Sequence, residues 1–307
     1  FLKKKFWKWL VFNAVERFES IKHILARMLR LIKSKTETGG LLMRYCLNIE
    51  ELFQDIDFYD RFKAAKEAGY DNVEFWGWNG RDIERIKHEC EINQINITGF
   101  KGDLDWSLCD LASRDDFIEW TRKSVATAKY LGCDSIIVHS NSIFEDGSSD
   151  YSDQYSYESQ IANITGTLIH AAGILEESGI KMYVEPLNNR GDLKGMFLTD
   201  AGVTADIIRA VNSSNIKMLC DLFHMQLMHG DLTTHLLKNL DIMDYIHIAD
   251  APGRGEPGTG ELNYGFIVKE IKKNGFDGVV CFEITPQGNM EDVIKAFNGV
   301  RDTAEQK

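Results

Sequence analysis

Four side chains that can bind a metal ion or move a proton stand at or near the ends of four successive apolar segments. They are Glu185, Asp221, His247 and Glu283. An unpaired charge in apolar surroundings is costly, so acidic residues in these places need a partner that neutralises them. Three carboxylates and one imidazole offer hard oxygen and nitrogen ligands, which favour a divalent ion such as Mg²⁺ or Mn²⁺ over a thiolate-bound zinc.

Each of these residues also has an ordinary structural explanation when it is taken alone. An acid at the end of a strand often caps the helix that follows, and a histidine in an apolar segment is often hydrogen-bonded within a core. The four residues, however, occupy the same end of four consecutive segments. This shared position favours one common site.

The predicted strands and helices that must position these residues alternate regularly along the chain. Short apolar segments occur at residues 43–49, 71–76, 94–99, 133–139, 180–185, 216–221, 242–248 and 276–283. Amphipathic stretches with helical spacing follow at residues 58–69, 79–91, 114–131, 155–178, 199–212, 229–239, 263–273 and 289–304. Such alternation predicts parallel strands with right-handed crossovers, and eight repeats predict an α/β fold of the (β/α)8 TIM barrel type. A doubly wound open sheet is the alternative.

The carboxyl ends of all strands meet at one face of such a barrel, which is where active sites lie. Further polar residues near the same segment ends are therefore expected to contact a substrate. They are Glu74, His139, Asn188, His224 and Arg254. The planar guanidinium of Arg254 matches a carboxylate or a phosphate, although a solvated loop charge is the ordinary alternative.

One glycine-rich stretch, Gly253–Gly258, matches the pattern G-x-G-x-x-G of a dinucleotide-binding turn. Pro257 stiffens this stretch, and it follows the seventh apolar segment rather than the first, where a dinucleotide fingerprint belongs. We therefore interpret it as a flexible loop or as one that covers the substrate.

The composition narrows the class of protein. The chain has 307 residues, with 35 Lys and Arg against 47 Asp and Glu and a formal net charge of −12, which disfavours nucleic acid as a partner. Six cysteines without a C-x-x-C pair predict free, buried thiols in a reducing compartment. No uninterrupted apolar stretch reaches the roughly 18 residues of a membrane span. We expect a cytoplasmic protein that acts on a small molecule, binds neither nucleic acid nor membrane and can pair into a homo-oligomer.

Residues 1–42 differ from the rest, with ten Lys and Arg against three Glu and apolar residues at helical spacing. We expect two regions, a basic amphipathic helical extension over 1–42 and the barrel over 43–307. We interpret the extension as dispensable, with Met43 as an alternative start. A helix packed on the barrel and a helix for a membrane or a partner are the other interpretations.

Several motifs carry a resemblance to a known family. The segment Cys220–Gln226, which reads CDLFHMQ, and the segment Ile246–Tyr264 closely resemble the hydroxypyruvate isomerase family of xylose isomerase-like barrels. Val184–Asn188 and the pair Phe282–Glu283 fit the same pattern, and the resemblance covers about residues 43–300.

The resemblance implies roles for individual residues. Glu185 and Glu283 would be the paired catalytic carboxylates, and with Asp221 and His247 they would form the metal site of related epimerases. His224 and Arg254 would contact the substrate.

The function expected from this resemblance is isomerisation of a small 2-oxo acid or sugar. The reaction would be of the type that converts hydroxypyruvate to tartronate semialdehyde, through a metal-stabilised enediolate and two glutamates. A ketose 3-epimerase on the same fold is the alternative. A phosphodiester-cleaving DNA-repair enzyme would need further ligands and a basic groove, and a sugar-binding protein without catalysis is the remaining class. The exact substrate, the metal, the glutamate that removes the proton and the oligomeric state stay open.

Overall fold

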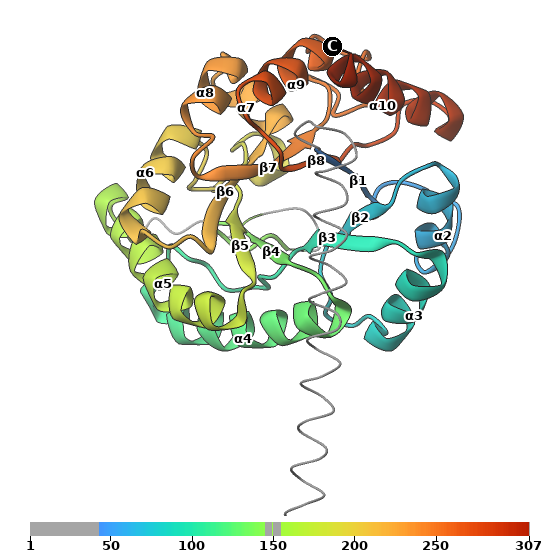
Figure 1. Ribbon diagram of the computed structural model, residues 1–307. Coiled ribbons are helices and arrows are strands. Elements are labelled where there is room, and N and C mark those ends of the chain that lie inside the picture. The colour runs from blue at the N-terminus through green and yellow to red at the C-terminus, as the bar shows by residue number, and fades with distance from the viewer. Residues whose placement is uncertain (1–42, 145–148, 150–154, 307) are drawn as a thin grey trace, which may run out of the picture. The chain divides into compact units, whose positions relative to one another are not determined.

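The computed structural model describes residues 43–144, 149 and 155–306, and the extension predicted over residues 1–42 lies outside them. Eight strands alternate with helices along this part of the chain (Figure 1). The strands are β1 (Arg44–Asn48), β2 (Asn72–Phe75), β3 (Asn96–Phe100), β4 (Ser135–Val138), β5 (Lys181–Val184), β6 (Ile216–Asp221), β7 (Met243–Ile248) and β8 (Val279–Phe282). Each strand overlaps the apolar segment predicted for it.

The helices surround the ring of strands (Figure 1). They are α2 (Asp60–Glu67), α3 (Ile83–Asn93), α4 (Arg114–Leu131), α5 (Tyr157–Ser178), α6 (Ala201–Val211), α7 (Leu222–Met228), α8 (Leu232–Lys238), α9 (Tyr264–Lys273) and α10 (Met290–Glu305). All but α7 correspond to the predicted amphipathic stretches.

The strands form one parallel sheet in the order β3-β2-β1-β8-β7-β6-β5-β4. The two ends of this order meet, because Lys101 after β3 pairs in parallel with Ile137 of β4, and the N–H of Gly102 donates to the Ile137 carbonyl at 2.7 Å. The sheet is therefore a nearly closed barrel. The predicted TIM barrel is confirmed, and the alternative of an open doubly wound sheet is wrong.

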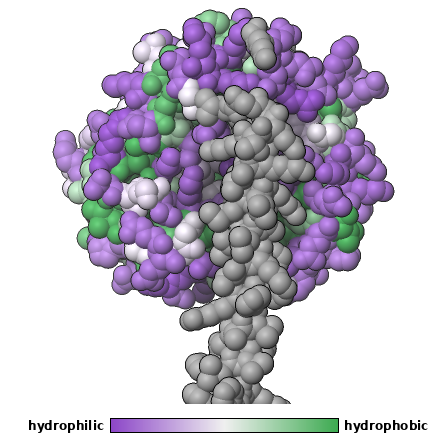
Figure 2. All heavy atoms as spheres, in the orientation of Figure 1, coloured by the Kyte–Doolittle hydropathy of each residue, from purple (hydrophilic) through white to green (hydrophobic). Residues whose placement is uncertain are grey.

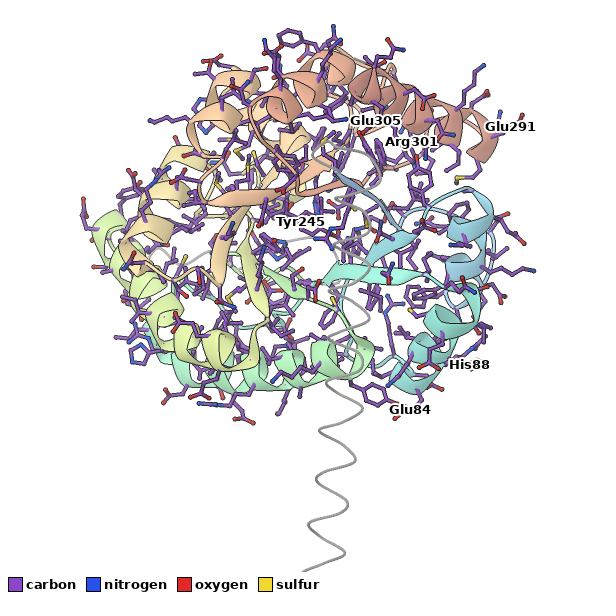
Figure 3. The ribbon with its side chains drawn as sticks, viewed as in Figure 1. Glu84, His88, Tyr245, Glu291, Arg301 and Glu305 are labelled. Carbon is purple, nitrogen blue, oxygen red and sulfur yellow. The ribbon has the colours of Figure 1, made fainter. Side chains whose placement is uncertain are left out.

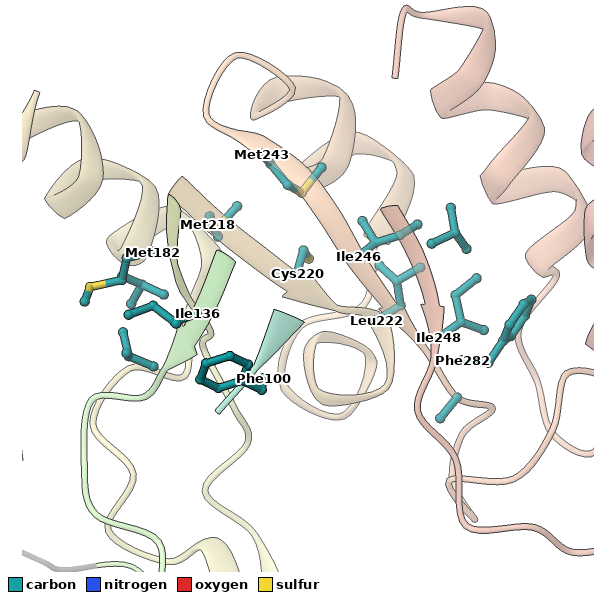
Figure 4. Packing of buried hydrophobic residues seen from close by; sticks show 14 of the residues in the cluster. Phe100, Ile136, Met182, Met218, Cys220, Leu222, Met243, Ile246, Ile248 and Phe282 are labelled. Carbon is teal, nitrogen blue, oxygen red and sulfur yellow. The ribbon is translucent and has the colours of Figure 1, made fainter. Parts of the chain in front are cut away.

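Side chains along each strand alternate between two apolar regions. One set packs between the strands and the helices and includes Ile136, Met182, Cys220, Ile246 and Phe282 (Figure 4). The other set fills the inside of the barrel and consists of Cys46, Ile137, Tyr183, Leu219, Tyr245, Val279 and Cys281. On β7, Ile246 faces the helices, so its neighbours Tyr245 and His247 face inward.

Helix α7 gives no separate signal in the sequence because no loop precedes it. Asp221 is both the last residue of β6 and the N-cap of α7. Its Oδ1 accepts hydrogen bonds from the backbone N–H groups of Phe223 at 2.8 Å and His224 at 3.2 Å. These bonds satisfy two of the amides left open at a helix start. The ordinary explanation of Asp221 as a cap therefore holds for one of its two oxygens.

All six cysteines are free thiols, as predicted, and the predicted burial holds for five of them, whereas Cys90 is half-buried. Among the described residues, no helix combines the length and the apolar character needed to cross a membrane. The visible surface of the barrel is mostly hydrophilic, with small separate hydrophobic areas (Figure 2).

A network of charged groups lies near the amino-terminal ends of the central strands. Asp244 of β7 accepts hydrogen bonds from Lys181 Nζ of β5 at 2.6 Å, from the Tyr183 hydroxyl at 2.5 Å and from Lys217 Nζ of β6 at 2.9 Å. Burial raises the pKa of Asp244, but Lys181, Tyr183 and Lys217 outweigh it and hold this pKa below its usual value. The network ties three neighbouring strands together at the end of the barrel opposite the predicted site.

Replacing Asp244 by Ala should destabilise the barrel by about 2 kcal/mol, since two ammonium groups and a hydroxyl lose their acceptor. Because the pKa is lowered by folding, the stabilisation exists above the ordinary aspartate pKa of about 3.9 and fades as the pH falls below it. Urea unfolding at pH 7 and pH 3 measures both effects. Glu67→Ala breaks an exposed ion pair to Lys63 and serves as the control, with an expected change below about 0.5 kcal/mol. Equal stabilities of the two variants at pH 7 would contradict the assignment.

Candidate active site

The four side chains predicted to bind a metal converge inside the barrel at the carboxyl ends of β5 to β8. Glu185, Asp221, His247 and Glu283 each place one ligand atom within 4.8 Å of the others. His247 Nδ1 lies 3.2 Å from Glu185 Oε1 and 3.1 Å from Glu283 Oε2. It lies 4.0 Å from Asp221 Oδ2. All four side chains are buried, so the cluster is a compact group of three acids and one imidazole.

The strand register brings these residues to one level. Asp221 of β6 pairs directly with His247 of β7. Glu185 and Glu283 each stand one residue beyond their strands. The N–H of Glu185 continues the ladder to a carbonyl of β4 at 3.0 Å, and the N–H of Glu283 continues it to a carbonyl of β7 at 3.2 Å. Regular parallel pairing thus fixes the backbone of the cluster.

Three atoms of the cluster lack a hydrogen-bond partner among the described residues. They are Glu185 Oε1, Asp221 Oδ2 and His247 Nδ1. Leaving buried polar atoms unpaired is costly, and so is placing carboxylates side by side. A divalent cation held by the four side chains would satisfy these atoms and neutralise the acids, and three oxygens with one nitrogen suit a hard or borderline ion. The residues present therefore fit such an ion.

Glu283 is held by donors on both of its oxygens. Arg254 Nη2 binds Oε2 at 2.7 Å, while Trp76 Nε1 and Asn48 Nδ2 bind Oε1 at 2.8 Å and 3.2 Å. Burial raises the pKa of Glu283, but Arg254 and His247 outweigh it and lower this pKa well below its usual value. The carboxylate is therefore ionised and fixed in orientation.

Glu185 has a different neighbour on its outer oxygen. Its Oε2 lies 3.2 Å from His139 Nε2, and His139 Nδ1 lies 3.0 Å from Asp103 Oδ2. Burial raises the pKa of Glu185, but His247 and His139 lower it to about 2. Burial lowers the pKa of His139, whereas Asp103 raises it to about 9. His139, predicted to contact a substrate, thus lies directly against Glu185.

His224 and Asn188 lie together beside Asp221. Asn188 Nδ2 is 2.7 Å from His224 Nδ1, and His224 Nε2 is 3.5 Å from Asp221 Oδ2. Burial lowers the pKa of His224. A neutral His224 can therefore meet an uncharged oxygen of a ligand at the cluster.

Arg254 reaches the cluster from the glycine-rich loop. Besides Glu283, its Nη2 lies 3.6 Å from Asp221 Oδ2. The loop is built on Asp250, whose carboxylate accepts from the N–H groups of Ala251, Gly258 and Leu262 at 3.0, 2.8 and 3.0 Å. The G-x-G-x-x-G pattern thus belongs to a loop that wraps around its own carboxylate and carries Arg254.

Glu74 is a buried neighbour of His247. Its Oε2 is 3.1 Å from His247 Nε2, on the side of the ring away from the cluster, and the residue is 2% exposed. Burial lowers the pKa of His247, but the carboxylates of Glu74, Glu185 and Glu283 outweigh it and raise this pKa well above its usual value. Glu74 therefore faces a cluster residue rather than the open end of the barrel.

Two hydrogen-bonding residues of the site were not singled out from the sequence. Asn48 ends β1 and binds both Glu74 and Glu283, and Asp103 follows β3 and binds His139. Both stand at or shortly after the ends of apolar segments. The rule that located the four cluster residues, applied to the first and third segments as well, would have found them.

Adding Mn²⁺ to the metal-free protein should raise its melting temperature by several degrees. At a concentration a hundredfold above the dissociation constant, binding adds about 2.7 kcal/mol to the stability of the folded state. Glu185→Gln removes one charged ligand and should strongly reduce this rise in melting temperature. Differential scanning calorimetry with and without a chelator measures the melting temperature of each protein. An unchanged melting temperature with both Mn²⁺ and Mg²⁺ would contradict the fit of the cluster to an ion.

Comparison with known proteins agrees with this geometry. Residues 62–300 match the model of the family described as xylose isomerase-like TIM barrel. The chain is 30% identical over 257 residues to hydroxypyruvate isomerase of Escherichia coli K12, a match that covers 81% of this chain and 96% of that relative. It is 27% identical over 257 residues to 2-oxo-tetronate isomerase of Pectobacterium atrosepticum, covering 81% and 94%.

A solved structure has the same architecture. The crystal structure of an AP endonuclease of family 2 from Brucella melitensis superposes with a TM-score of 0.77 at 25% identity, covering 84% of this chain and 99% of that one. These findings confirm the resemblance to the hydroxypyruvate isomerase family and the prediction of an enzyme of the isomerase class. The chain belongs to the xylose isomerase-like TIM barrel family.

Proposed function

We propose that this enzyme isomerises a small 2-oxo acid by moving a proton between adjacent carbons, as in the conversion of hydroxypyruvate to tartronate semialdehyde. The observation that carries the proposal is the pair of ionised glutamates, Glu185 and Glu283, that approach His247 Nδ1 at 3.2 and 3.1 Å. Two carboxylates in one buried site can remove a proton and return one. The similarity to hydroxypyruvate isomerase supports this reaction class.

The reaction balances without an external oxidant or reductant. One C–H proton leaves C3 of hydroxypyruvate, which is acidified by the C2 carbonyl, and the electron pair forms an enediolate. A proton then reaches C2, while the C3 hydroxyl proton is lost and the former carbonyl oxygen gains one. The product has an aldehyde at C3 and a hydroxyl at C2.

A divalent ion in the cluster, for which Mg²⁺ or Mn²⁺ suits the ligands, supplies positive charge that stabilises the negative oxygens of the enediolate. Glu185, Asp221, His247 and Glu283 would hold it. One of the two glutamates removes the C3 proton and the other supplies the proton to C2. His139 lies on Glu185, and Arg254 lies on Glu283, so each glutamate has its own polar partner.

Arg254 is proposed to hold the carboxylate of the substrate. It binds Glu283 and Asp221 through Nη2, and the guanidinium fork has further N–H groups with which to bind an acid in a bidentate manner. His224 and Asn188 border the same space and would contact the hydroxyl or carbonyl oxygens. A substrate with a carboxylate beside its ketone uses all of these groups.

The residues of the site fit the other function classes less well. A ketose 3-epimerase would use both glutamates on one carbon but would leave Arg254 without a carboxylate to bind. A phosphodiesterase with several metal ions would need more ligands. The described residues contain only two groups of three or more candidate ligands, and His247 belongs to both.

Product analysis with purified protein tests the proposal. Supplied with Mn²⁺, the enzyme should convert hydroxypyruvate or a four-carbon 2-oxo acid to the isomer with the carbonyl at the neighbouring carbon, detected by NMR. Ketoses of five or six carbons should react much more slowly, because they lack the carboxylate that Arg254 recognises. A new C3 epimer from a ketose, with no reaction of any 2-oxo acid, would replace this proposal by the epimerase.

Glu185→Gln and Glu283→Gln should each lower kcat by about 10²- to 10⁴-fold, the range for a lost acid or base. Because both residues are also proposed metal ligands, the assay must be run at saturating Mn²⁺, with the bound metal measured in each variant. Glu261→Gln is the matched control, since Glu261 on the exposed part of the loop binds Gln226. A metal-loaded Glu283→Gln enzyme with wild-type kcat would refute the role of Glu283.

A further inference from the structure

A line of buried polar side chains lies inside the barrel below the cluster, and the proposed reaction does not use it. It consists of Glu74, Tyr245, Thr98 and Cys46, none of which is more than 3% exposed. Tyr245 lies in the middle of the ring of strands (Figure 3). The labelled residues of two helices lie outside this ring, namely Glu84 and His88 of α3 and Arg301 and Glu305 of α10. Polar groups in such an interior must satisfy one another.

The hydrogen bond at the head of this line has a defined direction. The Glu74 carboxylate accepts, so the Tyr245 hydroxyl donates to Glu74 Oε2. The Thr98 hydroxyl oxygen lies 2.8 Å from the Tyr245 oxygen and 3.3 Å from the Val73 carbonyl, and the Cys46 thiol lies 2.9 Å from the Thr98 oxygen. The Tyr245 proton thus points toward Glu74, and Thr98 and Cys46 continue the line of polar contacts behind it.

Glu74 also fixes the histidine of the cluster. Its Oε2 lies 3.1 Å from His247 Nε2, and its Oε1 accepts from Asn48 Nδ2 at 2.9 Å. With the Nε2 proton donated to Glu74, the other ring nitrogen, Nδ1, is the one that can bind a cation, which displaces the proton that the neighbouring carboxylates favour there. Nδ1 is the atom that faces Glu185 and Glu283 without a hydrogen-bond partner among the described residues.

We propose that Glu74 and Tyr245 are positioning residues, which hold His247 in the tautomer and orientation that bind the metal through Nδ1. Carboxylates behind metal-binding histidines act in this way in general. Tyr245 in turn orients the Glu74 carboxylate, and Thr98 orients Tyr245. Glu74 therefore acts on the metal through His247, a role that we propose for it in place of the substrate contact predicted from its position. The inference rests on the metal site of the proposed function and is independent of the substrate.

The test is Mn²⁺ affinity of the metal-free full chain, measured by isothermal titration calorimetry at neutral pH without substrate. Glu74→Gln should weaken binding by about 10- to 100-fold, because a glutamine amide can donate to Nε2 as well as accept from it and no longer selects the tautomer. Tyr245→Phe removes one hydroxyl and should weaken binding by a few-fold.

The matched control is Tyr183→Phe. The Tyr183 ring lies 5.0 Å from that of Tyr245 inside the same barrel, but its hydroxyl binds Asp244 at the other end. This variant loses the same atom and the same type of hydrogen bond to a carboxylate. It should bind Mn²⁺ with wild-type affinity, even if its melting temperature falls. A purely structural role for Tyr245 would make the two Tyr→Phe variants alike in both measurements.

The outcomes separate the inference from the proposed function. The inference would be overturned if folded Glu74→Gln bound Mn²⁺ with wild-type affinity. If Glu74→Gln does not fold, wild-type affinity of Tyr245→Phe would overturn it instead. Either result would count whether or not the enzyme converts hydroxypyruvate. Weakened binding in these variants, with Tyr183→Phe unchanged, would support it even if no 2-oxo acid reacted. Absence of Mn²⁺ binding to the wild-type chain would overturn it together with the metal site.

Discussion

The convergence of three buried carboxylates on one imidazole is the constraint on which the rest of this structure depends. Glu185, Asp221 and Glu283 lie around His247 at the carboxyl ends of four neighbouring strands. The acids stay ionised together because His247, His139 and Arg254 outweigh the effect of burial, and because a barrel whose strands are paired on both sides holds these partners in place. The same arrangement serves the proposed chemistry when a cation and a substrate oxygen enter, because the groups that stabilise the developing negative charge are already in place.

Successive side chains of β7 face different regions of the barrel. Asp244 ties the amino-terminal ends of the strands to two lysines, Tyr245 lies within the interior, Ile246 packs against the helices, and His247 reaches the cluster. One six-residue strand thus contributes to stability, to the proposed support of the metal ligand and to the site itself. Its neighbours β6 and β8 hold it in register through direct pairing, so the depth of each inward residue is set by the barrel geometry.

The sequence was sufficient to predict the barrel and the four cluster residues, because both depend on local signals. Apolar segments alternating with amphipathic stretches specify parallel strands, and the parallel arrangement alone brings their carboxyl ends together. Helix α7 was missed because Asp221 serves as both strand end and cap, which leaves no loop to mark a boundary. The contact of Glu74 with His247 has no signal in the sequence. Glu74 stands near the end of its segment like the others, and only the folded barrel shows that its carboxylate lies against His247 Nε2. Asn48 and Asp103 needed the same three-dimensional information to be connected with Glu283 and His139.

Solvent deuterium exchange shows whether two carboxylates of this site move a proton between adjacent carbons of a 2-oxo acid. The Mn²⁺-loaded enzyme is incubated with hydroxypyruvate in D₂O, and the hydrogens at C2 and C3 are followed by NMR. Since a carboxylic acid exchanges its proton with solvent, we expect deuterium at C2 of the product and gradual loss of the C3 hydrogens of the remaining substrate. A product that forms without any solvent deuterium would contradict proton transfer by the glutamates, and would indicate direct transfer of hydrogen between the two carbons.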